Sequence, residues 1–263
     1  MKPVYRFVCL FLLFGLSAPG AISSAITEAE ADFNEGKALA KKRQFKKAIP
    51  FFDHAAKLAP NVAVIYAERG SAYLNLEQIE PAFADLSRAI KLAPTLCQPY
   101  ADRARCEYEK HNCRAAIDDM SHAIPLASDK VDRAFKIRER ATYYLDLGDS
   151  KNALVDVNKS LTIFPDFYTY FLRADMHCRL KQYKEAVADY TTGLKLVKPN
   201  TIDLDFWYEQ RARAYDKLGE TKLAAKDREQ SRQSNLKDPY YKLLGPSEKG
   251  GWELPSGLGK PHQ

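Results

Sequence analysis

Residues 64–94 read VIYAERGSAYLNLEQIEPAFADLSRAIKLAP, and this stretch decides the fold because the rest of the chain copies it. Its first half places Tyr66, Gly70 and Tyr73 three and four residues apart. This spacing puts the three side chains on one face of a helix, as in an amphipathic helix that buries one side. The first half of the stretch therefore predicts a helix with a small residue at the centre of its buried face.

The second half of the stretch predicts another helix after a break at residues 76–80. Ala82, Leu86 and Ala89 again share one helical face. Pro94 ends this helix, because its ring removes an N–H donor and disfavours helix just before it. Where the small residues of the two helices meet, the backbones can approach closely. The stretch is therefore expected to form a helical hairpin.

Small residues recur at matching offsets in six copies of this unit, with a period of about 34 residues. In the first helix the small-residue column is Gly36, Gly70, Ala104, Ala141, Ala174 and Ala212. In the second helix the columns are Ala48, Ala82, Ala116, Ala153, Ala186 and Ala224, and Ala55, Ala89, Ala123, Ser160, Gly193 and Ser231. This self-similarity predicts an all-α repeat array whose hairpins contact their neighbours.

The pattern resembles the tetratricopeptide repeat family. That family carries Trp, Leu-Gly, Tyr, Ala, Phe, Ala and Pro, which are matched here by Tyr66, Gly70, Tyr73, Ala82, Leu86, Ala89 and Pro94. The resemblance covers residues 29–234 and implies a right-handed superhelical α-solenoid that binds a protein or peptide on its concave face. The expected hairpins are residues 29–62, 63–96, 97–130, 134–166, 167–200 and 205–235.

The two ends of the chain are expected to lie outside the array. Residues 1–25 have a charged start, an apolar run at residues 7–16 and small residues leading to Ala25, which is the layout of a signal peptide. Cleavage near Ala25 would export the protein to the periplasm or the exterior with no membrane insertion; the alternative is an uncleaved anchor. Residues 236–263 are rich in Gly and Pro and predict a flexible tail.

Five of the six copies depart from the family in the same two places. An Arg replaces the Leu before the small residue, and an Asp stands in the second helix: Arg69, Arg103, Arg140, Arg173 and Arg211, with Asp85, Asp119, Asp156, Asp189 and Asp227. The first copy has neither. Each Arg is therefore predicted to pair with the Asp of its own repeat and not with a neighbour's. Such ion pairs would fix helix register, a structural role and not a catalytic one.

Residues that point away from the partner helix of each hairpin predict the binding surface. Aromatic and Arg side chains most often supply binding energy at interfaces. The candidates are Arg105, Tyr108, Arg138, Tyr168, Phe171, Arg179 and Arg213. The alternative is that Phe171 packs between helices and Tyr168 merely ends one. Positive and negative charges nearly balance along this surface, which favours a protein or peptide partner over nucleic acid.

The third repeat contains Cys97, Cys106, Cys113 and the intervening His111. Too few ligands with suitable spacing are present for zinc, so no metal is predicted. An oxidising compartment would permit a Cys106–Cys113 disulfide, because both lie near the junction of the two helices. Buried free thiols are the alternative.

The turn of the first repeat contains five cations: Lys41, Lys42, Arg43, Lys46 and Lys47. We interpret them as a solvated turn in preference to an anion-binding patch. The net charge of +6 falls to +4 without Lys2 and Arg6, too little to demand nucleic acid or an anionic membrane. No HExxH, GxSxG or P-loop pattern occurs, so no enzyme and no cofactor are predicted. A scaffold is favoured over a permanent envelope subunit, and the oligomeric state stays open.

Overall fold

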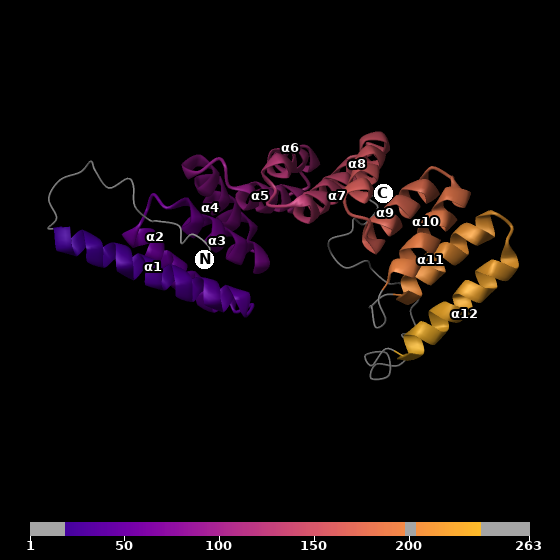
Figure 1. Cartoon of the computed structure of the whole chain (residues 1–263), viewed down its shortest axis with the longest axis horizontal. Coiled ribbons are helices and arrows are strands. Elements are labelled where there is room, and N and C mark those ends of the chain that lie inside the picture. Colours follow the sequence, from indigo (N-terminus) through magenta and orange to yellow (C-terminus); the bar gives the residue numbers. More distant parts are fainter. Residues whose placement is uncertain (1–18, 198–203, 238–263) are drawn as a thin grey trace. The chain divides into compact units, whose positions relative to one another are not determined.

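The computed structural model describes residues 19–197 and 204–237, and these residues form twelve α-helices, one short 3₁₀ helix and no strand (Figure 1). The prediction of an all-α chain built from hairpins is therefore confirmed over the described ranges. Two compact units divide the chain, one ending at Pro94 and the other beginning at Thr95.

The first unit contains two hairpins. Its helices are α1 (Pro19–Lys41), α2 (Phe45–Leu58), α3 (Ala63–Asn75) and α4 (Ile79–Leu92). Helix α1 packs against α2, α2 against α3, and α3 against α4. A Cβ added to Gly36 would lie 2.7 Å from the ring of Phe52, and one added to Gly70 would lie 2.8 Å from Leu86. The small residues of the first helices therefore allow the close helix contacts that their spacing predicts.

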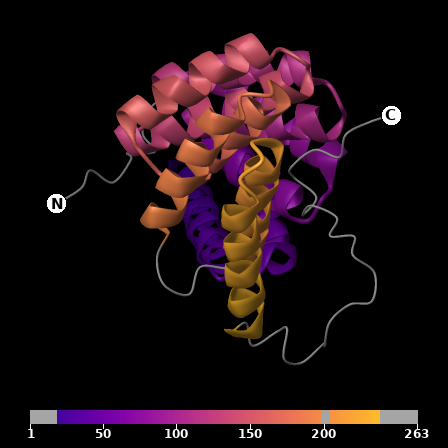
Figure 2. The ribbon, with the colours of Figure 1, turned by 90° about the vertical axis from the view of Figure 1, so that its right-hand side faces the viewer.

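The second unit contains four hairpins. Its helices are α5 (Cys97–Glu109), α6 (Cys113–Ala123), the 3₁₀ helix η1 (Ile124–Leu126), α7 (Lys130–Asp146), α8 (Ser150–Ile163), α9 (Phe167–Arg179), α10 (Tyr183–Leu196), α11 (Leu204–Lys217) and α12 (Thr221–Lys237). Each odd-numbered helix packs against the following helix, and α6, α8 and α10 also contact the next hairpin. Figure 2 shows α12 in yellow beside α11, as Figure 1 does.

The turn inside every hairpin contains one residue with positive φ. These residues are Arg43, Glu77, His111, Gly148, Lys181 and Gly219, with φ between 58° and 85°. Only glycine adopts this left-handed conformation without a steric cost. The repeats therefore share one turn geometry, and only the fourth and sixth use the residue best suited to it.

The start of α1 differs from the expectation. Residues 1–25 were expected to lie outside the array, whereas α1 begins at Pro19 and continues through Ala25 to Lys41. Proline is compatible with the first turn of a helix, where its missing N–H has no intrahelical partner. The rest of the predicted signal segment, residues 1–18, and nearly all of the predicted tail lie outside the described residues. No described helix has the length and apolarity needed to cross a bilayer.

Candidate protein-interaction surface

Each of the five Arg–Asp pairs forms a bidentate ion pair inside its own hairpin. The guanidinium Nε and Nη2 atoms donate to the two carboxylate oxygens at 2.7–2.8 Å. The Asp side chains are only 5–10 % exposed and the Arg side chains 15–24 %. The hydrogen bond to Asp156 raises the pKa of Arg140, so this guanidinium stays charged. The guanidinium donors and carboxylate acceptors of these pairs therefore bond to each other and are not available to a ligand.

Four of these guanidinium groups also donate to the preceding repeat, which the column comparison did not predict. The Nη1 atom of Arg140 donates to Ser121 Oγ on α6 at 2.8 Å. The matching acceptors are Asp53 for Arg69 at 2.7 Å, Asn158 for Arg173 at 2.7 Å and Thr191 for Arg211 at 3.0 Å. Each Arg does pair with the Asp of its own repeat, as predicted. The prediction that none pairs with a neighbour's Asp is wrong for Arg69, which also forms an ion pair with Asp53. The four arginines link both the two helices of a hairpin and two consecutive hairpins.

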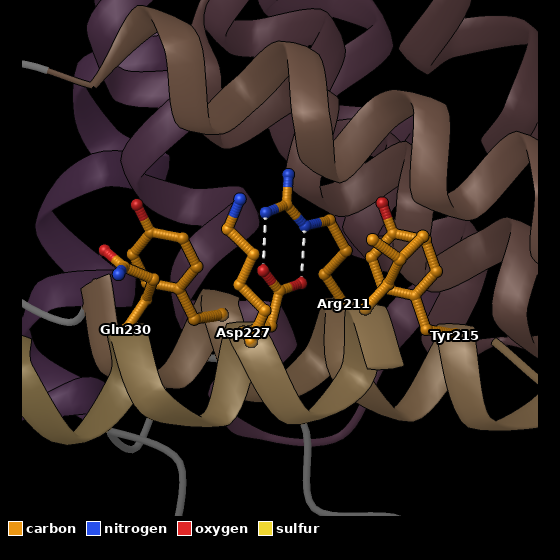
Figure 3. Close-up of a pocket in the computed structure, with 7 residues that line it drawn as sticks. Arg211, Tyr215, Asp227 and Gln230 are labelled. Carbon is orange, nitrogen blue, oxygen red and sulfur yellow. Dashed lines mark hydrogen bonds and ion pairs between the residues drawn. The ribbon is translucent and has the colours of Figure 1, made fainter. Parts of the chain in front are cut away.

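A pocket of about 370 Å³ surrounds the last of these pairs, between α11 and α12 (Figure 3). Its lining residues are Tyr208, Arg211, Tyr215, Leu223, Lys226, Asp227 and Gln230. In the second repeat the guanidinium carbon of Arg88 lies 4.6 Å from the ring centroid of Tyr66, the residue equivalent to Tyr208. Gln230 takes the place of Arg88 in the sixth repeat. The pocket therefore results from this difference between the repeats, and the ion pair that it surrounds is structural.

Phe171 is a core residue and not part of a binding surface. Its side chain is fully buried, its ring stacks on Trp207 with centroids 4.2 Å apart, and it also contacts Tyr190. A Cβ on Gly193 would lie 2.4 Å from the Phe171 ring, so this glycine makes room for it. The prediction that Phe171 binds a partner is wrong, because its side chain fills the space between hairpins.

Arg105 and Tyr108 lie in a polar network between α5 and α7. Arg105 donates to both carboxylate oxygens of Glu139, at 2.6 and 3.1 Å, and Tyr108 donates to Asp146. The rings of Tyr108 and Tyr143 lie 4.8 Å apart. Burial, followed by the bond to Asp146, raises the pKa of Tyr108. Both predicted binding residues are therefore already engaged in contacts between neighbouring repeats.

Arg138 and Tyr168, in contrast, belong to an exposed cluster. The Arg138 guanidinium carbon lies 4.9 Å from the ring centroid of Phe135 and 6.0 Å from that of Tyr168. Phe135 makes an edge contact with Phe164 at 5.8 Å. Val131 lies one helical turn before Phe135 and therefore on the same face of α7. We call Val131, Phe135, Arg138, Phe164 and Tyr168 the aromatic patch.

The aromatic patch combines a fixed cation with exposed apolar rings. Arg138 Nη1 donates to Asp166 Oδ1 at 2.9 Å. Asp166 is the N-cap of α9 and accepts a bond from the Thr169 N–H at 3.2 Å. Val131, Phe135 and Tyr168 are 38 %, 39 % and 50 % exposed. Large apolar side chains gathered on a surface mark interaction sites more than scattered ones do.

The other predicted binding residues lie elsewhere in the second unit. Arg179 is exposed at the end of α9, and Arg213 is exposed on α11 beside Glu209, with 3.3 Å between Nε and Oε1. Sequence reasoning missed Val131, Phe135 and Phe164. Phe135 occupies the same repeat position as Tyr168, so comparison of that column would have found it.

The four cysteines among the described residues are free thiols, so the predicted Cys106–Cys113 bond is not formed. Cys106 is fully buried on the core face of α5, whereas Cys113 is partly exposed at the start of α6. Burial raises the pKa of Cys106 to about 12 and also raises that of Cys113. The alternative interpretation, a buried thiol that packs as a small apolar residue, fits Cys106.

We expect these thiols to react with iodoacetamide in a defined order. At pH 8 a thiol with a pKa near 12 is thiolate in only about one molecule in ten thousand, and this fraction rises about tenfold per pH unit. Cys113 should therefore be alkylated in the folded protein well before Cys106. Peptide mapping by mass spectrometry measures both rates, and unfolding should make them equal. Blocked thiols that react only after reduction would contradict the free-thiol assignment.

The histidines and acids do not assemble a metal site in the part of the chain that the structure describes. His54 Nδ1 lies 2.5 Å from Asp32 Oδ2, and His122 stacks on Tyr100 at 5.4 Å. Across residues 19–197 and 204–237, no group of three or more His, Cys, Asp or Glu side chains could hold a metal ion.

Comparison with protein families matches the tetratricopeptide repeat at residues 29–62 and at residues 63–96. A search of curated proteins found no match. Among solved structures, Pseudomonas aeruginosa pilF is 14 % identical with a TM-score of 0.66, over 85 % of this chain and 98 % of that chain. PilW, described as a widely conserved type IV pilus biogenesis factor, is 10 % identical with a TM-score of 0.68, over 82 % and 97 %.

A third structure contains a tetratricopeptide repeat sensor. It is the signal-transduction ATPase PH0952 from Pyrococcus horikoshii, 18 % identical with a TM-score of 0.67, over 81 % of this chain and 37 % of that chain. At these identities the likeness concerns the fold alone. The chain therefore contains two matched tetratricopeptide repeats, at residues 29–62 and 63–96, and its described hairpins share the fold of these solved structures.

Proposed function

We propose that the protein is a scaffold outside the cytoplasm that binds a protein or peptide partner through the aromatic patch of its second unit. Tetratricopeptide repeats generally bind proteins or peptides. The observation that carries the proposal is the exposed group of Phe135 and Tyr168 around a guanidinium that Asp166 holds in place. Arg and aromatic side chains dominate binding energy at interfaces, and a fixed side chain loses little entropy on binding.

The proposed location rests on the sequence of residues 1–25, with its charged start, apolar run and small residues. The fold likeness to PilW is consistent with a role in the cell envelope. A binding role is favoured over catalysis because the buried charged pairs serve packing between repeats, and a catalytic pair would not be needed five times.

Photo-crosslinking tests the aromatic patch. A benzoylphenylalanine at position 168, in the source cells, is expected to crosslink one defined protein. Adding Phe135→Ala should lower the yield about tenfold or more, because truncating a central hot-spot residue costs about 2 kcal/mol or more of binding energy. The exposed Leu180, at the far end of α9, provides a matched control position for the probe.

Equal crosslinking from positions 168 and 180, or a yield that Phe135→Ala leaves unchanged, would count against the aromatic patch. The alternative of a permanent structural subunit makes a different prediction. In that case the purified chain should self-associate or precipitate through exposed apolar surface, whereas a recruiting scaffold should remain a stable monomer. Analytical ultracentrifugation of the purified protein distinguishes the two.

A further inference from the structure

The turn between α1 and α2 gathers five cations within seven residues. They are Lys41, Lys42, Arg43, Lys46 and Lys47, which we call the basic turn. All five are exposed. Phe45, in the same segment, packs instead against the core of the first unit. The turn therefore presents charge to the outside and directs its one large apolar side chain inward.

The cations of the basic turn have no internal partner among the residues that the structure describes. Within residues 19–197 and 204–237, no hydrogen bond or ion pair involves any of their five side chains. Neighbouring charges in the same unit do find partners. Lys37 lies 3.4 Å from Glu68, and His54 lies 2.5 Å from Asp32. Unpaired cations at this density repel one another, so their clustering does not serve the stability of the unit.

Two of these cations stand where a helix favours negative charge. Lys46 and Lys47 occupy the first turn of α2, which contains no acidic residue. The positive end of the helix dipole lies at this terminus, so cations there are unfavourable. The equivalent turn contains Glu80 in α4 and Glu185 in α10, whereas α6, α8 and α12 also lack an acid there and have one cation each. The first repeat differs from the others in placing two cations and no acid at this terminus.

The acids of α1 are separated from the basic turn along the helix. Glu28, Glu30, Asp32 and Glu35 precede the basic turn, which begins at the last residue of α1. From Glu35, the nearest of the four, to Lys41 the helix rises about 9 Å, about one Debye length at physiological ionic strength, and the other three acids lie farther away. An approaching partner therefore meets a local cluster of positive charge.

We propose that the basic turn binds the anionic headgroups of a phospholipid surface. Four of its five cations are lysines, a residue type that is depleted at protein interfaces, and no exposed aromatic side chain accompanies them. Lysine is a compact, strongly hydrated charge, and clusters of lysines bind diffuse anionic membrane surfaces. This activity is independent of the aromatic patch, which belongs to the second unit, and it would hold the scaffold at a membrane without inserting it.

Vesicle co-sedimentation with the full chain tests this proposal. Vesicles of about one-third phosphatidylglycerol in phosphatidylcholine should bind the protein, and vesicles of phosphatidylcholine alone should bind it far less. Changing all five residues of the basic turn to Gln should weaken binding to the anionic vesicles about a hundredfold or more. Binding should also fall steeply as salt rises.

A charge-matched variant separates the basic turn from net charge. Lys57, Lys91, Lys151, Lys159 and Lys222 are exposed lysines dispersed along the chain. Their combined replacement by Gln removes the same charge and should reduce vesicle binding less than threefold. Equal losses in the two variants would overturn the proposal. Tighter binding of polyglutamate or of a DNA duplex than of vesicles, at equal charge concentration, would also overturn it.

Discussion

Replacing Arg140 by alanine is expected to lower the free energy of unfolding by about 3–5 kcal/mol. The substitution leaves the carboxylate of Asp156, whose side chain is 6 % exposed, buried without its counter-charge. It also removes the hydrogen bond from Nη1 to Ser121, which joins α7 to α6. Urea unfolding followed by circular dichroism measures the change.

Two further variants show which property of Arg140 matters. Arg140→Lys keeps the charge but cannot donate two parallel bonds to Asp156 and a third to Ser121, so it should recover only part of the loss. Arg133→Ala, an exposed arginine on the same helix, should change stability by less than about 0.5 kcal/mol. Similar effects for Arg140→Ala and Arg133→Ala would refute the structural role of the ion pair.

The sequence predicts one of the two kinds of contact that these arginines make. Five copies contain both Arg and Asp and the first contains neither, so the pairing within each hairpin follows from the columns alone. The contacts to the preceding repeat were not predicted, because their acceptors differ in residue type. Asp53, Ser121, Asn158 and Thr191 all stand two residues after the Asp-column position of their repeat, and they share only a hydrogen-bonding oxygen.

The candidate surface was harder to predict because helical spacing does not separate exposed from buried faces once hairpins stack. Tyr168 and Phe171 lie one turn apart on α9, yet one is half exposed and the other fully buried. The sequence did contain a signal for Phe171. The third small-residue column holds Ala or Ser in the other repeats and Gly193 only in the fifth, where a large ring needs the space.

Replacing Phe171 by alanine is accordingly expected to lower the free energy of unfolding by about 3–5 kcal/mol. The ring is fully buried and stacked on Trp207, so its loss leaves a cavity between α9, α10 and α11. Tyr168→Ala provides the control, because a half-exposed ring on the same helix should cost less than about 1 kcal/mol. Chemical denaturation of both variants makes the comparison.

The pair of Phe171 and Gly193 allows a sharper test, because the effect of one substitution should change sign with the other. In the native chain Gly193→Ala brings a Cβ within 2.4 Å of the Phe171 ring and should destabilise α10. In the Phe171→Ala background that clash is absent, and alanine is favoured over glycine inside a helix by about 1 kcal/mol. Gly193→Ala should then stabilise the protein. A double-mutant cycle in urea measures the coupling, and additive effects would show that Gly193 does not shape the space for this ring.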